Sequence, residues 1–294
     1  MDHINSHSTE TKLAKDNIGS LIARYSIPAS IAFVFFSIQS IIDGIIVGNY
    51  LGADAVASVS LILPAYTLPS SIALMLGIGA QAQMSIAMGE QDYQKFKTAL
   101  KTGVISIITY AIIIKLVFNS FPHHLTELMG AKGALYEGSL DYVRGLMPFI
   151  GSNLCFIFLD YMLKTLGHPR FSMIMVVSSI LMNIVLSIVF VTQLGLGTFG
   201  VGLATGISIT AGCIVSAIVV WKHFRHHPNL KGIKGKFSWQ WLGRMLYNGS
   251  SEGVTEIAIG VTVVLFNFTF LKYAGKEGVA AFAEIGRASC RERV

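Results

Sequence analysis

The chain has 294 residues, of which 53% are hydrophobic and only 13% are charged, and its formal net charge is +6. Soluble domains carry about 25% charged residues, so this composition excludes an ordinary water-soluble domain and indicates a membrane protein. The sequence contains no phosphate-binding, nucleophile or zinc motif, and its three cysteines show no metal or disulfide spacing. We therefore expect neither an enzyme nor a bound cofactor.

Seven apolar segments are long enough to cross a bilayer core about 30 Å thick, which takes about 17 to 25 helical residues. The predicted spans are 21–47, 55–88, 102–118, 140–163, 171–191, 199–221 and 245–271. They predict an all-α polytopic membrane protein. The first 20 residues are polar, so we expect no cleaved signal peptide.

Lysine and arginine are concentrated in alternate connections between the spans. The amino-terminal segment and the second-to-third, fourth-to-fifth and sixth-to-seventh connections are basic, whereas residues 49–54 and 192–198 contain no Lys or Arg. The positive-inside rule then predicts a cytoplasmic amino terminus in a plasma membrane, such as a bacterial inner membrane. The positive charge is explained by topology, so we expect membrane lipid as a partner and no nucleic acid.

An internal repeat suggests two lobes. Residues 50–57 and 273–280 share a tyrosine, a glycine, an acid, a valine and an alanine in register, and each copy follows a long apolar helix. Such repeats are typical of two-lobed transporters, and the six spans before the basic linker make the repeats parallel. The predicted units are an amino-terminal segment (1–20), a six-helix first lobe (21–222), a basic linker (223–243), the start of a second lobe (244–285) and a non-native tail (286–294), which is polar where another span is expected.

Polar side chains inside the spans are the candidate functional residues, because such groups are costly in a bilayer and often mark an ion path. At 1.5 Å per residue, Asp43 and Ser187 lie about 24 Å from the inner face, Thr205 about 20 Å and Asn183 about 18 Å. Their oxygens could bind Na⁺, at Asp43, Asn183 and Thr205, or Asp43 could bind a proton. Gln39 lies one turn below Asp43 on the same helical face. We expect no other metal site.

A second acidic pair occurs in the seventh span. Glu252 and Glu256 are four residues apart and share a helical face, so they could bind a cationic substrate or relay protons. Pro28 is expected to mark either a bend in the first span or its start.

At these residues the chain resembles the multidrug and toxic compound extrusion (MATE) family of cation-coupled efflux transporters. The stretches that carry the resemblance are Pro28 with Ile42-Asp43-Gly44 and Leu51-Gly52, then Gly77–Asp92, and then Leu181–Leu186 with Gly200–Thr205. The resemblance covers nearly all of this chain but only about two-thirds of a family member. It implies twelve helices in two bundles, alternating access, and export of small cationic or amphipathic drugs against inward Na⁺ or H⁺ flow, with no obligate protein partner.

The resemblance also implies roles for single residues. Pro28, Asp43, Asn183 and Thr205 match the first-lobe cation site, and Ser187 stands where many members have a second Asp. Glu256 matches the acid of the second lobe, and Glu252 resembles a feature of one branch of exporters.

Two other functions are compatible with parts of the pattern. A flippase for lipid-linked precursors shares the general architecture, but its cavity is expected to carry several Arg or Lys residues for phosphate groups. A seven-helix receptor or regulatory protein suits the number of spans, yet it requires an external amino terminus and leaves the repeat unexplained. The sequence therefore favours multidrug efflux, while the choice between Na⁺ and H⁺, the drug spectrum and the oligomeric state stay open.

Overall fold

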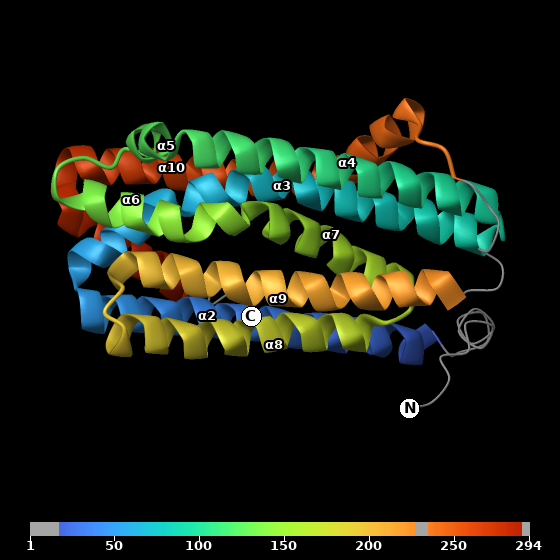
Figure 1. Ribbon diagram of the computed structural model, residues 1–294, viewed down its shortest axis with the longest axis horizontal. Helices are drawn as coiled ribbons and strands as arrows, with labels where there is room; N and C mark the ends of the chain where they lie inside the picture. Colours follow the sequence, from blue (N-terminus) through green and yellow to red (C-terminus); the bar gives the residue numbers. More distant parts are fainter. Residues whose placement is uncertain (1–17, 227–234, 290–294) are drawn as a thin grey trace.

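The computed structural model describes residues 18–226 and 235–289, and the structural statements here concern those residues. They form a bundle of long helices that lie side by side (Figure 1). The elements are α2 (Ile18–Leu51), α3 (Ala53–Gly89), α4 (Tyr93–Ser120), α5 (Pro122–Leu128), α6 (Ala134–Leu146), η1 (Met147–Phe149), α7 (Ile150–Thr165), α8 (Pro169–Ile188), η2 (Val189–Gln193), α9 (Gly197–His226) and α10 (Trp239–Ser289).

Seven stretches of the described chain are long and apolar enough to cross a membrane, and they follow the seven predicted spans in order. The fourth stretch, Ala134–Thr165, differs from the continuous helix predicted over 140–163. It is interrupted by the 3₁₀ turn Met147–Phe149, which contains Pro148. Proline lacks the backbone N–H that a helix interior needs, so the break at this residue has a local cause.

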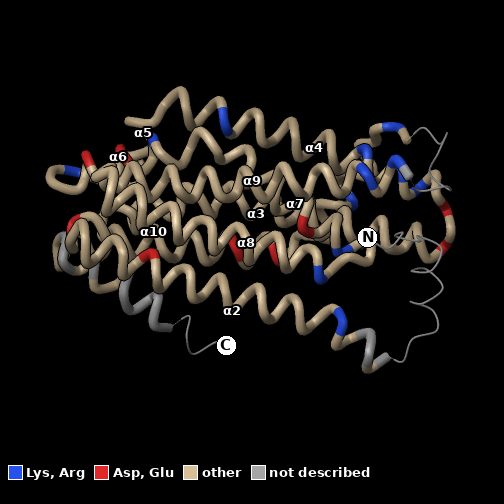
Figure 2. Tube along the Cα trace, turned by 60° about the horizontal axis from the view of Figure 1, so that its bottom comes forward, with Lys and Arg blue, Asp and Glu red and all other residues tan. Residues whose placement is uncertain are grey.

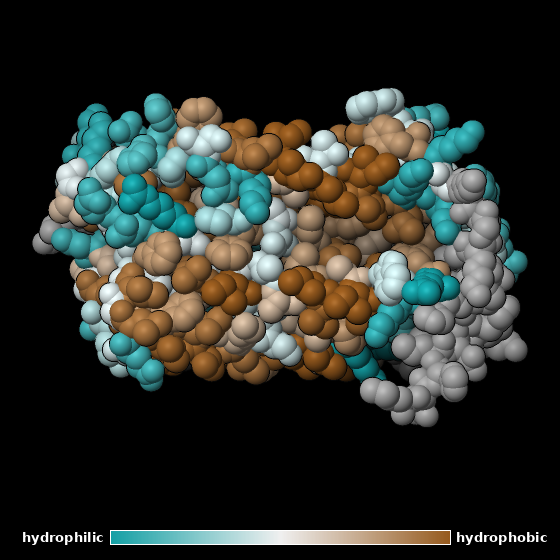
Figure 3. All heavy atoms as spheres, viewed as in Figure 1, coloured by the Kyte–Doolittle hydropathy of each residue, from teal (hydrophilic) through white to brown (hydrophobic). Residues whose placement is uncertain are grey.

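Pro28 lies inside α2 and does not begin the helix, so the interpretation of Pro28 as a helix start is wrong. A bend at this residue stays a prediction. The surface of the bundle matches a bilayer: hydrophobic side chains cover the middle, and hydrophilic side chains gather toward the two ends (Figure 3). Large apolar side chains such as Phe33, Phe36 and Leu116 of the apolar spans are exposed, and a lipid environment would contact them.

α3 forms the centre of the bundle. In its most apolar stretch 56% of residues are buried, against 11% for α2 and for α10. α10 runs along α3 in the opposite direction, and glycines let the two backbones approach closely. A Cβ atom built on Gly79 would lie 1.9 Å from the Met245 carbonyl oxygen, and one on Gly249 would lie 2.1 Å from that of Met75. Farther along the same contact, Asn267 Nδ2 donates to the Ser60 carbonyl at 3.3 Å.

The two copies of the sequence repeat have the same local structure. Gly52 and Gly275 both have positive φ, at 86° and 61°, in a region that L-residues rarely adopt. Before each glycine a tyrosine is exposed, and after it a valine is buried: Val56 is 2% exposed and Val279 is 0% exposed. Val279 packs in one cluster with Ala57 of the first copy and with Leu61, one turn farther along α3. The two copies therefore match in backbone and burial and also contact each other.

The boundaries of the predicted lobes stay a prediction. Most of the amino-terminal segment (1–17), part of the linker (227–234) and the end of the tail (290–294) lie outside the described residues.

Candidate cation-binding site

Three of the predicted site residues form a partly buried hydrogen-bonded chain across α2, α8 and α9. Gln39 Nε2 donates to Asn183 Oδ1 at 2.7 Å, and Asn183 Nδ2 donates to Thr205 Oγ1 at 3.0 Å. Thr205 Oγ1 in turn donates to the Val201 carbonyl at 3.1 Å. Asn183 is only 1% exposed. The sequence placed Asn183 and Thr205 in one layer of the membrane, and the structure joins them directly.

Asp43 and Ser187 lie one helical turn beyond this chain of hydrogen bonds. α2 and α8 run in the same direction (Figure 1), Asp43 follows Gln39 by four residues, and Ser187 follows Asn183 by four residues. Residues four apart lie on the same face of a helix. Asp43 and Ser187 therefore lie at the same height along α2 and α8, one turn beyond Gln39 and Asn183. Asp43 Oδ1 and Ser187 Oγ are both shielded from solvent.

The Ser187 hydroxyl is the sharpest indication of a ligand. It is 0% exposed, and among the described residues its Oγ has no hydrogen-bond partner. Leaving a buried polar group unsatisfied costs about 1–3 kcal/mol, so most such groups have a partner. A water molecule, a proton on a neighbouring carboxylate or a bound cation would each satisfy this oxygen.

The donor set fits a singly charged hard cation or a proton. It offers one carboxylate, one amide oxygen and two hydroxyls, which are ligands that Na⁺ accepts. The Asn183 amide oxygen accepts one hydrogen bond from Gln39 and retains a second lone pair. Within the described part of the chain, His, Cys, Asp and Glu form no cluster of three or more that could hold a metal ion.

A feature that the sequence did not predict begins two residues after Ser187. Residues Val189–Gln193 form a π-helical turn, η2, at the end of α8. Such turns change the direction of the backbone carbonyls and occur often at functional sites. The residues of this turn are mostly apolar, and we find no sequence signal that would have revealed it.

The second acidic pair is separate from this site. Glu252 is exposed and Glu256 is half-buried on α10, and both are close enough to Tyr161 of α7 to interact with it electrostatically. No hydrogen bond joins either residue to Asn183 or Thr205 in the described structure. The structure thus brings Gln39, Asn183 and Thr205 together by hydrogen bonds, and in the described residues neither glutamate takes part in them.

A buried polar network between α3 and α7 was also missed by the sequence analysis. Tyr66 Oη donates to Asn153 Oδ1 at 2.7 Å, and Asn153 Nδ2 donates to Ser70 Oγ at 3.1 Å. An asparagine inside the fourth apolar span was the available signal, of the same kind that pointed to Asn183.

Within the described chain, seven helices are long and apolar enough to cross a membrane, and three of them carry a carboxylate, amides and hydroxyls inside the apolar spans. These features define a polytopic helical membrane protein of the transporter class. The sequence profile of the MatE family matches residues 28–189, more than half of the chain, and the chain belongs to this family.

The chain is similar to the multidrug export protein MepA of Staphylococcus aureus (strain MRSA252), with 23% identity over 274 residues, which is 91% of this chain and 59% of MepA. It is also similar to MepA of Staphylococcus saprophyticus, with 23% identity over 197 residues, 66% of this chain and 43% of the relative. The chain thus spans about three-fifths of the length of the Staphylococcus aureus relative.

Two solved structures of a multidrug resistance MATE family transporter of the MOP superfamily share the fold. The outward-facing conformation has a TM-score of 0.80 and 22% identity, covering 98% of this chain and 63% of that chain. The inward-facing conformation has a TM-score of 0.76 and 23% identity, covering 90% of this chain and 60% of that chain. The resemblance to the MATE family and the all-α polytopic fold are both confirmed.

Proposed function

We propose that the whole protein exports small cationic or amphipathic drugs by alternating access, driven by inward flow of Na⁺ or H⁺ through a site at Asp43. The observation that carries this proposal is a membrane-embedded carboxylate beside the hydrogen-bonded Gln39, Asn183 and Thr205. Membership in the MatE family and similarity to proteins named for multidrug export support the drug substrate. This chain matches only part of such a protein, so the proposal concerns the complete transporter.

In this proposal each residue of the cluster has a distinct part. Asp43 supplies the negative charge that attracts the cation or accepts the proton. Gln39 and Thr205 fix the Asn183 amide, so that its oxygen is directed toward α2 and its nitrogen toward α9. Ser187 supplies a neutral oxygen at the level of Asp43. Coupling follows if the cation binds one arrangement of α2 and α8 more tightly than the other.

The acidic pair on α10 supports a cationic substrate. Glu252 and Glu256 place two carboxylates on a surface of the start of the predicted second lobe, and carboxylates in a membrane protein attract cations. A lipid-precursor flippase would instead need basic residues in the cavity, whereas the cluster at Asp43 contains an acid, amides and hydroxyls. Membership in the MatE family argues against a seven-helix receptor.

We also infer a bacterial plasma membrane with the amino terminus in the cytoplasm. Lys and Arg gather mainly at the end of the bundle where α2 begins (Figure 2). This asymmetry supports the orientation expected from the positive-inside rule.

The proposal is tested by Asp43→Asn in the complete protein, with Asp141→Asn as the control because Asp141 is a half-exposed acid on α6. We expect the Asp43 variant to reach the membrane at normal levels and to lose at least about tenfold in ethidium export, while the control exports normally. Normal export by Asp43→Asn would exclude Asp43 as the coupling residue. Export that persists without a Na⁺ gradient and stops when the pH gradient is removed would select H⁺ as the coupling ion.

A further inference from the structure

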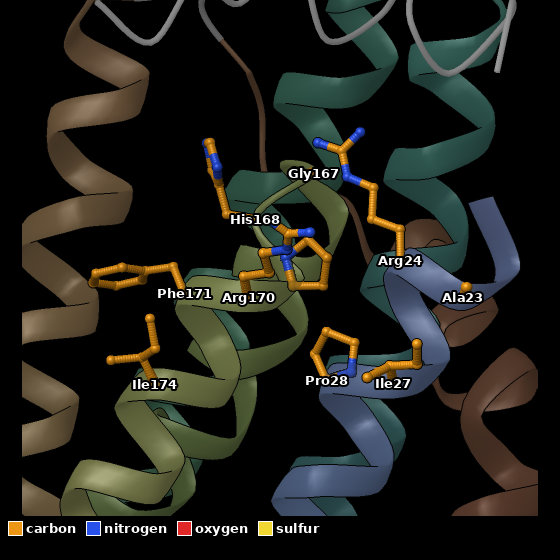
Figure 4. Close-up of a pocket in the computed structure, with 10 residues that line it drawn as sticks. Ala23, Arg24, Ile27, Pro28, Gly167, His168, Arg170, Phe171 and Ile174 are labelled. Atoms are coloured by element: carbon orange, nitrogen blue, oxygen red, sulfur yellow. The ribbon is translucent and has the colours of Figure 1, made fainter. Parts of the chain in front are cut away.

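A basic cavity lies at the amino-terminal end of α2, beside the turn that joins α7 to α8. Its volume is about 680 Å³, and its lining includes Arg24 of α2, His168 of the turn and Arg170 of α8. Figure 4 shows these three side chains coming from the two sides of the cavity. None of the ten described residues that line it is Asp or Glu.

Further groups near the cavity make it favourable to anions. α8 begins at Pro169, so the positive end of its helix dipole lies among the lining residues. Asp160, a carboxylate of the neighbouring α7, accepts from Lys164 Nζ at 2.5 Å and from the Ser172 hydroxyl. Its charge is therefore already paired within the helices.

His168 adds a donor whose charge depends on its surroundings. Burial, together with the nearby Arg24 guanidinium, lowers the pKa of the His168 imidazole. Its Nε2 lies 3.4 Å from His223 Nδ1 of α9, the titratable group that faces it from that helix. An anion in the cavity would offset the electrostatic repulsion between the Arg24 guanidinium and a protonated His168 imidazole. It would also accept a hydrogen bond from an N–H of this imidazole.

The cavity has basic side chains at its outer end and apolar side chains farther in, as a phospholipid-binding site requires. Arg24 and Arg170 lie at the ends of the apolar spans Ile22–Leu51 and Pro169–Gln193. Basic residues at span ends meet lipid head groups when the helices cross a bilayer. Ile27 and Ile174 line the same cavity about one turn farther into the bundle, and they are 57% and 48% exposed. Figure 4 places their side chains below the arginines, on the inward side.

We propose that this cavity binds the phosphate of an anionic phospholipid, with Arg24 and Arg170 on the head group and Ile27 and Ile174 against an acyl chain. Basic pockets between membrane helices are suited to such head groups. Two arginines, with the exposed side chains of Ile27 and Ile174 directly beneath them, favour a lipid over a free phosphate. A free phosphate has no apolar part that could contact the two isoleucines. The proposal does not depend on the transported substrate or on the coupling ion.

The test is a titration of the purified 294-residue chain in detergent with phosphatidylglycerol, with bound lipid counted by native mass spectrometry and phosphatidylcholine as the neutral comparison. The test variant is Arg24→Gln/Arg170→Gln. Arg225→Gln/Arg244→Gln is the matched control, because both arginines are exposed, lie outside the cavity and stack on Trp221 and Trp241. Size-exclusion profiles confirm that each variant is folded.

We expect one high-affinity phosphatidylglycerol in the parent chain, and a loss of about fivefold in its affinity for each arginine removed from the cavity. The control variant and Arg24→Lys/Arg170→Lys should stay within about twofold of the parent. If the double glutamine variant does not fold, Arg170→Gln alone should still lose about fivefold in affinity. Equal phosphatidylglycerol affinity in the cavity variant and the control would overturn the proposal. Displacement of the lipid by millimolar inorganic phosphate would overturn it as well, because the site would then take free phosphate.

Discussion

At the scale of single residues, Ser187 allows the cation site to be tested separately from the fold. Its hydroxyl is buried without a partner in the described structure, so Ser187→Ala removes an unsatisfied group and leaves the packing in place. Without Na⁺ we expect the free energy of unfolding to be unchanged or to rise by up to about 1–3 kcal/mol, because the substitution removes an unsatisfied buried group. If the oxygen binds Na⁺, the increase in melting temperature on adding NaCl in place of choline chloride should shrink.

Ser178→Ala is the matched control on the same helix, because Ser178 is exposed. It should leave the Na⁺-dependent shift unchanged. A loss of more than about 1 kcal/mol in Ser187→Ala without Na⁺ would show that the hydroxyl has a partner in the fold.

The sequence revealed the candidate residues but not their contacts. Polar atoms are costly in a bilayer, so Asp43, Asn183 and Thr205 stood out without a structure. Which of them face one another depends on how each helix is rotated about its axis, and a count of residues along a span does not give that rotation. For this reason the sequence placed Asn183 and Thr205 at similar depths, whereas the hydrogen bond between them became visible only in the structure.

At the scale of elements, the α3–α10 contact depends on glycine. Gly79→Ala places a Cβ against the Met245 carbonyl, and neither backbone can move aside without disturbing the helix. We expect a loss of about 1–3 kcal/mol, measured as a lower melting temperature of the purified chain. Gly89→Ala is the control, since a Cβ there meets nothing within 4 Å. Equal melting temperatures for the two variants would contradict the close approach of α3 and α10.

Element lengths were predictable, whereas element interruptions were not. Apolar length alone located all seven spans, because a bilayer imposes a minimum on it. The 3₁₀ turn at Met147–Phe149 and the π turn at Val189–Gln193 depend on one or two backbone hydrogen bonds. Hydropathy does not report such bonds, although Pro148 was a visible cause for the first interruption.

At the scale of the whole molecule, the inferred orientation can be measured directly. Single cysteines are introduced as Gln91→Cys and Leu194→Cys in a variant without the native cysteines. Gln91 lies in the α3–α4 connection, Leu194 follows η2, and both residues are exposed. We expect a membrane-impermeant maleimide to label Leu194→Cys in intact cells, and Gln91→Cys only after the cells are opened. The reverse labelling pattern would place the amino terminus outside the cell. It would contradict the orientation that the positive-inside rule predicts.

The burial of α3 has a consequence for the timing of biosynthesis. α3 ends at Gly89 and its partner α10 begins at Trp239, 150 residues later. At about 5–20 residues per second, a ribosome needs about 8–30 s to bridge that interval. During this wait the glycine-lined face of α3 meets lipid or the insertion machinery instead of α10. We therefore expect α3 to depend on a chaperone that shields nascent membrane helices until α10 is made.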